Sequence, residues 1–125
     1  MHSIHKNITR LAQENDWFRK EVVTDDKSQV MLMSLKPGEE IGEEEHKVDQ
    51  TLVFVSGSGK AIFEGKEESI EIDDLFFIPA STKHNFINTG QEDLKLFTIY
   101  APPEHKAGTN HRTKDEAVND PNEQD

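Results

Sequence analysis

The chain has 125 residues, of which 14 are basic and 25 acidic, so its formal net charge is −11. A surface this negative repels phosphate backbones and anionic lipids, so neither nucleic acid nor a membrane is an expected partner. The length fits one domain, and an apolar fraction of 33% allows one modest core. Because there is no cysteine, disulfides, thiolate nucleophiles and zinc–thiolate sites are excluded.

The N-terminal residues predict a short helix and no targeting segment. Residues 1–8 lack the apolar stretch of a signal peptide, and no later apolar run is long enough to cross a bilayer. We therefore expect a cytoplasmic protein. Ile8, Leu11 and Ala12 have the i, i+3, i+4 spacing of one helix face, which predicts a helix over 7–15.

From Trp17 onward the pattern is that of β-structure. Short runs rich in Val, Ile, Leu and Phe alternate with turn residues at a spacing of about 8–12 residues, which is typical of a sandwich or barrel. No helical pattern interrupts them, so βαβ units are not expected. The predicted strands are 18–24, 29–36, 41–46, 51–55, 60–64, 67–72, 75–79, 84–89 and 94–101.

The C-terminal part of the chain is polar. Pro102 and Pro103 end the last predicted strand, because neither proline can donate to a ladder. The remainder predicts a tail with little core of its own, disordered beyond about Ala117. The expected organisation is a helical segment at 1–16, a barrel at 17–101 and a polar tail at 102–125.

Two of the six histidines lie within or beside predicted strands. Alternate residues of a strand share a face, so Glu44 and His46 should point the same way, and Gln50 follows just before the next strand. His84 adds a fourth group from a neighbouring strand. Imidazole combined with oxygen ligands suits Zn, Mn, Fe or Ni, whereas hydrogen bonding among these groups and water is the plainer alternative. The remaining histidines lie at the N-terminus or in the predicted tail: His2, His5, His105 and His111.

Two blocks of the sequence, 37–50 and 73–88, resemble the paired motifs of the cupin superfamily. In the second block Pro79, His84 and Asn88 match the family pattern of a strand, a proline, a short turn, a histidine and then an asparagine. The resemblance implies an all-β fold, a double-stranded β-helix (cupin or jelly-roll) barrel, here with a short N-terminal helix and a polar C-terminal tail.

The resemblance also implies one divalent metal ion in the barrel mouth. Carried over position by position, the family's four metal ligands fall on Glu44, His46, Gln50 and His84. Glu44 stands where the family has histidine, and Gln50 stands where it has glutamate. The longer stretch 98–114 is similar to small cupins of the mannose-6-phosphate isomerase-like type.

These features leave several functions open. One is a metal-dependent enzyme, an isomerase or a dioxygenase, acting on a small polar molecule, with a sugar-like molecule among the candidates; no catalytic residue is assigned. The acidic run 39–49 disfavours a phosphorylated sugar. The alternatives are a non-catalytic module for small ligands and a structural dimer without metal. A homodimer is expected in each case, because small cupins pair their sheets and six strand phenylalanines exceed what one barrel needs inside.

Overall fold

Alternating burial along the strands builds the molecule from two β-sheets. In β8 (Leu94–Ala101) every second residue is buried, namely Leu94, Leu96, Thr98 and Tyr100, while the residues between them are more exposed. The structure is a computed structural model that describes residues 3–123. The two-sheet, all-β architecture predicted from the strand pattern is confirmed.

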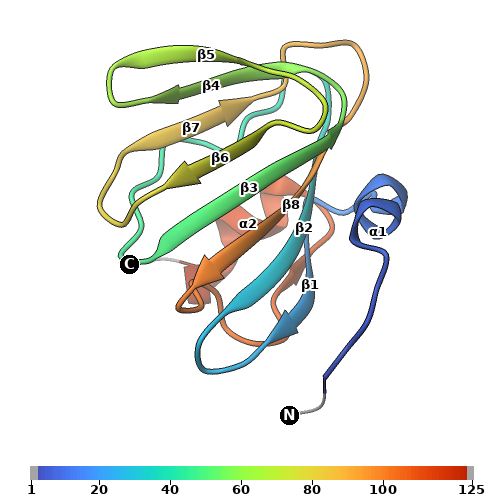
Figure 1. The fold of residues 1–125 in the computed structure, drawn as a ribbon, viewed down its shortest axis with the longest axis vertical. Helices are drawn as coiled ribbons and strands as arrows, with labels where there is room; N and C mark the ends of the chain where they lie inside the picture. The colour runs from blue at the N-terminus through green and yellow to red at the C-terminus, as the bar shows by residue number, and fades with distance from the viewer. Residues whose placement is uncertain (1–2, 124–125) are drawn as a thin grey trace.

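The larger sheet has six strands in the order β6-β3-β8-β2-β1-β9, and the smaller sheet has three in the order β5-β4-β7 (Figure 1). All neighbouring strands pair antiparallel. The remaining strands are β1 (Arg19–Thr24), β2 (Gln29–Leu35), β3 (Asp49–Ser56), β4 (Gly59–Phe63), β5 (Lys66–Ile70), β6 (Leu75–Ile78), β7 (His84–Ile87) and β9 (Asn110–His111).

The main core lies between the two sheets. Phe54 of β3, Phe76 of β6 and Phe86 of β7 pack ring against ring, with centroids 5.5 to 5.8 Å apart. Leu52 and Leu96 are fully buried in the same cluster. Burying these large side chains is the main source of stability for a fold with so modest an apolar fraction.

The predicted N-terminal helix is confirmed as α1 (Ile8–Glu14), which packs on the outer face of the larger sheet. Asn7 caps it by accepting a hydrogen bond from the backbone N–H of Arg10 at 3.0 Å. Ala12 is buried against this face, with Leu11 packed beside it. No helix among residues 3–123 has the length and apolar character needed to cross a membrane, and the cytoplasmic location stays a prediction.

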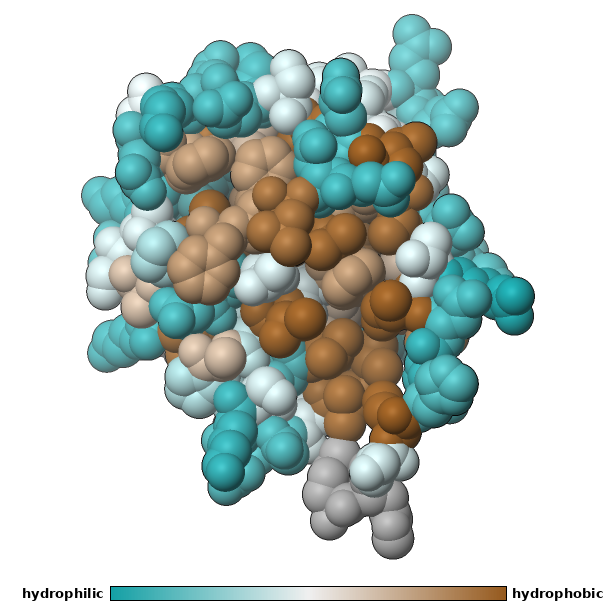
Figure 2. All heavy atoms as spheres, in the orientation of Figure 1, coloured by the Kyte–Doolittle hydropathy of each residue, from teal (hydrophilic) through white to brown (hydrophobic). Residues whose placement is uncertain are grey.

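The part of the outer face that α1 does not cover exposes apolar side chains. Phe76 of β6 points into the core, so its neighbours Leu75 and Phe77 point outward and are 61% and 54% exposed. Ile72, just before this strand, is 60% exposed. Figure 2 shows hydrophobic residues gathered over the middle of the face seen in Figure 1.

The prediction of a strand at 41–46 is wrong. This stretch makes one isolated bridge, Glu44 to His84, and a second isolated bridge joins Glu40, just before it, to Ile87. Gly42 has a φ of +104°, a conformation that interrupts an extended run and that residues other than glycine rarely adopt. The stretch is therefore a connecting segment between β2 and β3 that lies alongside β7, with backbone hydrogen bonds to Phe86 and His84.

The prediction of disorder beyond about Ala117 is also wrong for the residues that the structure describes. The polar segment forms β9, then α2 (Lys114–Asn119) and a 3₁₀ turn, η1 (Pro121–Glu123). Ala117 is buried in the main core cluster, and His105 and His111 are buried as well. Histidine–carboxylate pairs fix this segment in place of a larger apolar core. The last two residues of the predicted tail lie outside the described residues.

Candidate metal centre

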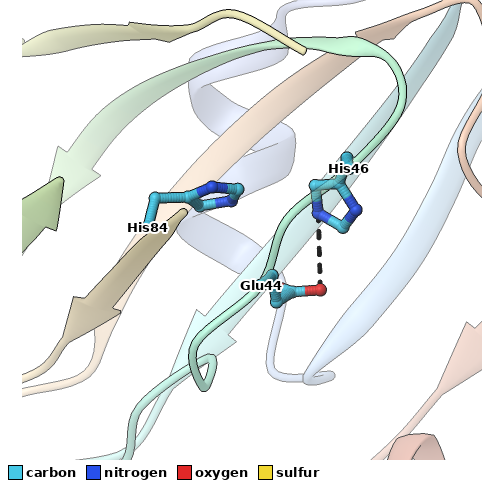
Figure 3. A group of neighbouring side chains, drawn as sticks. All are labelled: Glu44, His46 and His84. Atoms are coloured by element: carbon cyan, nitrogen blue, oxygen red, sulfur yellow. Dashed lines mark ion pairs between the residues drawn. The ribbon is translucent and has the colours of Figure 1, made fainter. Parts of the chain in front are cut away.

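Three of the four predicted ligands meet in one group. Glu44, His46 and His84 each offer a ligand atom, and these atoms all lie within 4.8 Å of one another. The two imidazole rings are 5.3 Å apart between centroids, and Glu44 Oε2 is 3.4 Å from His46 Nε2. Figure 3 shows the three side chains pointing toward one another, with His84 coming from the start of β7.

The backbone holds the connecting segment in register with β7. The N–H of Glu44 donates to the carbonyl of His84 at 2.9 Å, and the N–H of His84 donates back at 3.0 Å. The N–H of Ser81 donates to the carbonyl of His46 at 2.7 Å. These three bonds bring Glu44 and His46 beside His84 although 41–46 forms no strand.

Each histidine of the group has one ring nitrogen against a hydrogen-bond acceptor, while the other makes no hydrogen bond. His84 Nδ1 lies 2.8 Å from the carbonyl of Thr82, and His46 Nδ1 lies 3.2 Å from Glu104 Oε2. A carbonyl and a carboxylate can only accept, so both Nδ1 atoms carry the proton. The two Nε2 atoms are buried and have no hydrogen-bond partner. Metal-binding histidines have this arrangement, in which an outer partner fixes the tautomer and the ring orientation.

Gln50 is connected to this group through Tyr100, and the orientation of its amide is determined. Its Nε2 donates to Thr98 Oγ1 at 3.1 Å and to the hydroxyl of Tyr100 at 3.2 Å. The hydroxyl of Thr98 itself donates to the carbonyl of Thr51, so it must accept from Gln50. The amide oxygen of Gln50 is then left buried without a partner. Tyr100 packs edge-on against His46 at 5.8 Å between centroids, so Gln50 and His46 share Tyr100 as a neighbour.

The C-terminal segment supplies partners that the sequence reasoning missed. Glu104 contacts His46, and His105 contacts both Tyr100, at 3.4 Å from Nε2 to the hydroxyl, and Glu123, at 2.8 Å from Nδ1. The available signal was a pair of histidines in a segment otherwise suited to solvent. It was read as part of a tail because its carboxylate partners lie up to 18 residues away.

The charges around the group favour a cation. Burial lowers the pKa of His46, but the hydrogen bond to Glu104 and the charges of Glu44 and Glu104 outweigh it, so the net shift of this pKa is upward. Burial is the main cause that lowers the pKa of His84, and the charge of His46 adds to it. Positive charge is thus stabilised beside His46 while the neighbouring imidazole stays neutral. A divalent cation would meet the same two carboxylates.

The donor set suits a borderline divalent metal. Two imidazole nitrogens, one carboxylate and one amide oxygen match Zn, Mn, Fe or Ni, and three of these groups have a buried, unpaired atom. Glu44 and His46 line a cavity of about 380 Å³ together with residues of the C-terminal segment, whereas His84 lines a separate cavity. A small molecule therefore has room beside the candidate centre.

Residues 31–100 match the cupin domain family, so the chain belongs to the cupins. All four candidate ligands lie inside the matched region, whereas Glu104, His105 and Glu123 lie beyond it. The jelly-roll fold class implied by the resemblance is thereby confirmed.

Individual relatives are similar over most of the chain. The crystal structure of BH2720 from Bacillus halodurans has 40% identity and a TM-score of 0.92, with 94% of each chain covered. The uncharacterized protein YrkC of Bacillus subtilis is 44% identical over 90% of this chain, which spans 64% of its length. The mannose-1-phosphate guanylyltransferase of Salmonella montevideo is 26% identical over 76% of this chain and 21% of its own length.

Proposed function

We propose that this cupin binds one divalent metal ion through Glu44, His46, Gln50 and His84, and takes a small polar molecule into the adjacent cavity. One observation carries the proposal. His46 and His84 each have Nδ1 held by an acceptor, and each leaves a buried Nε2 without a hydrogen bond; that of His46 has only the 3.4 Å contact with Glu44. Leaving a buried polar atom unpaired costs about 1–3 kcal/mol, and a shared cation would remove this cost for both rings at once.

The chain's own residues define what such a centre can do. A bound divalent metal would supply Lewis-acid polarisation of a ligand oxygen. Glu44 would contribute negative charge, and the Glu104 contact would keep the lone pair of His46 directed inward. An isomerase, a dioxygenase and a non-catalytic binding module all fit this centre, whereas a structural dimer needs no metal.

The ligand we propose is not phosphorylated. A link to mannose-6-phosphate isomerase-like cupins is supported only by the guanylyltransferase, of which this chain matches a small part. Five carboxylates line the cavity, and a dianionic phosphate would meet more repulsion there than a neutral or singly charged molecule. They belong to Glu43, Glu44, Glu45, Glu104 and Glu123.

The test is metal titration of chelator-stripped protein by calorimetry, with Zn²⁺, Mn²⁺, Fe²⁺ and Ni²⁺. We expect one ion per chain for at least one of them, and a loss of affinity of at least about 100-fold in His84→Ala. His111→Ala is the matched control, because His111 is as buried as His84 but has both ring nitrogens bonded. Its metal affinity should stay within about threefold. No binding by the wild type, or equal loss in both variants, would overturn the proposal.

We also propose that two copies pair through the exposed apolar face of the larger sheet. Ile72, Leu75 and Phe77 are each more than half exposed on or beside the edge strand β6, and apolar patches of this kind mark interaction surfaces. Phe77→Asp should then convert a dimer to a monomer in light scattering, while Ile4→Asp, at an exposed N-terminal position, should not. A monomeric wild type at micromolar concentration contradicts this assembly.

A further inference from the structure

Arg19 lines the same cavity as the candidate centre and is almost completely buried. It is the first residue of β1, and only 5% of it is exposed. Arginine is rarely buried to this degree without a carboxylate partner, because removing a guanidinium charge from water is costly. Its surroundings therefore need a full account.

The contacts of Arg19 do not neutralise its charge directly. Its Nη1 donates to His111 Nδ1 at 3.2 Å, and its guanidinium lies 5.1 Å from the centre of the Phe18 ring. His111 Nε2 lies 2.8 Å from Asp120 Oδ2, so the imidazole ring of His111 separates this carboxylate from Arg19. The Nε–H of Arg19 is buried and has no partner. Among residues 3–123, Arg19 makes no ion pair within 4.0 Å.

The interior carboxylates of the cavity are engaged elsewhere. Glu44 and Glu104 both contact His46, and Glu123 is held by His105. The other two acidic residues of the lining, Glu43 and Glu45, are exposed at the rim, where water screens them. Arg19 is thus a buried cation in the wall of a cavity whose interior carboxylates are already paired with histidines.

A second cation lies on the same cavity. Lys114, at the start of α2, is half-buried in the lining and makes no ion pair within 4.0 Å among the described residues.

The positive charge of Arg19 also affects groups at and near the candidate centre. Burial raises the pKa of Glu123, but His105 and the charge of Arg19 outweigh it and shift this pKa downward, and the charge of Arg19 opposes protonation of His46.

We propose that Arg19, assisted by Lys114, binds the carboxylate of a small ligand whose other oxygen atoms face the candidate metal. The inference rests on the proposed function, that is on the metal site, for the part of the ligand that faces the metal. A guanidinium with an unpaired N–H is suited to a carboxylate acceptor, and a charge-assisted hydrogen bond of this kind is stronger than a neutral one. A single negative charge suits one buried guanidinium and one lysine better than a phosphate dianion does, given the acidic rim. Both cations lie outside residues 31–100, so the cupin match does not imply this position.

The experiment compares probes that share one polyol chain and differ in the charge at one end. Gluconate carries a carboxylate, sorbitol is neutral and glucamine carries an ammonium group. With metal-loaded full-length protein, gluconate should bind at least about tenfold more tightly than sorbitol or glucamine. Arg19→Met should remove this preference, Arg19→Lys should keep part of it, and Lys114→Met should weaken gluconate binding about threefold without affecting the fold. Free gluconate also chelates metal in solution, but this affects the wild type and the variants equally. The difference between their affinities for gluconate is therefore independent of chelation.

The outcomes separate this inference from the proposed function. If Arg19→Met binds metal like the wild type but no longer prefers gluconate, the inference holds. If wild-type protein binds metal and shows no preference for gluconate, or does not bind it at all, the inference fails while the metal proposal stands. If the wild type binds no metal but its gluconate binding still depends on Arg19, the anion position stands alone. Preference for glucamine, or tighter binding of sorbitol 6-phosphate than of gluconate, overturns the assignment of a carboxylate.

Discussion

Two groups of histidines and carboxylates lie near the cavity, and they differ in one respect. Glu44, His46 and His84 form the first group, and the second consists of His111, Asp120 and Glu123 of the C-terminal segment; in both, candidate ligand atoms lie within 4.8 Å of one another. In the second group both nitrogens of His111 have partners, Arg19 on one side and Asp120 on the other. In the first, each histidine keeps one buried nitrogen without a hydrogen bond, and that of His46 faces Glu44 Oε2 at 3.4 Å.

The difference shows that composition and proximity alone do not define a metal site. A ring with both nitrogens bonded acts as a structural link, and the guanidinium of Arg19 beside His111 opposes a second cation there. A ring with one nitrogen held by an acceptor and the other free offers a directed lone pair. We therefore infer that the first group binds a cation and that the second fastens the C-terminal segment to β1.

The largest expected effect is that His111→Ala lowers stability more than metal affinity, whereas His84→Ala lowers metal affinity more than stability. His111→Ala leaves Arg19 and Asp120 without their shared partner, so we expect the metal-free protein to lose about 2–4 kcal/mol of unfolding free energy. His84→Ala should cost distinctly less in the metal-free protein, because it removes one hydrogen bond, from Nδ1 to the carbonyl of Thr82, and leaves no buried guanidinium without a partner. Urea denaturation after chelation measures both. Equal losses of unfolding free energy in the two variants would remove the distinction between the groups.

Much of the barrel was predictable from the sequence because local pattern and tertiary role agree there. Strand residues alternate between core and surface, and Asn88, which matches the cupin pattern, fixes its turn, with Nδ2 donating to the carbonyls of Leu35 and Glu92. The face of α1 followed directly from three apolar residues.

The parts that sequence reasoning missed depend on contacts between distant residues. The segment 41–46 has strand-like composition, but Gly42 interrupts it and its one bridge joins Glu44 to His84. Beyond Tyr100, burial depends on polar pairs such as His105 with Glu123, and a buried histidine–carboxylate pair looks in sequence like two solvated residues. The burial of Arg19 could not be predicted for the same reason, because it depends on β9 and the segment that follows it.

A smaller effect should rank the ligands within the first group. Gln50→Ala should weaken metal binding by about tenfold, less than His46→Ala or His84→Ala, because an amide oxygen is a poorer donor than imidazole. Gln50→Glu should bind the metal more tightly than the wild type, since the carboxylate adds negative charge to the centre. Metal titrations of the four variants under one buffer test the order. Equal loss from Gln50→Ala and the histidine variants would show that the ranking by donor type is wrong.

The smallest expected effect is a pH-dependent loosening of the C-terminal segment. Burial raises the pKa of Glu104 and of Glu123, but hydrogen bonds to His46 and His105 outweigh it, and a hydrogen bond to His111 is the main cause that lowers the pKa of Asp120. All three net shifts are downward from ordinary values of 4.5 for glutamate and 3.8 for aspartate. A carboxylate whose pKa is lowered in the folded state stabilises the fold when the pH is above the ordinary pKa of the unfolded chain. This contribution is lost as the pH falls through the folded-state pKa. Attachment of the segment should therefore persist at neutral pH and weaken below about pH 4.5.

The single tryptophan of the chain reports on that attachment. The guanidinium of Arg112 lies 5.1 Å from the centre of the Trp17 ring, and the N–H of Phe18 donates to the carbonyl of Arg112 at 3.1 Å. In metal-free protein, Trp17 fluorescence should change between about pH 4.5 and pH 3 while the far-ultraviolet circular dichroism of the strands is retained. Glu123→Gln removes one titrating carboxylate and should reduce the pH dependence, whereas Arg112→Ala should change the fluorescence at neutral pH. If both signals change together at one pH in the wild type, the segment does not open separately, and its histidine pairs stabilise the barrel as a single unit.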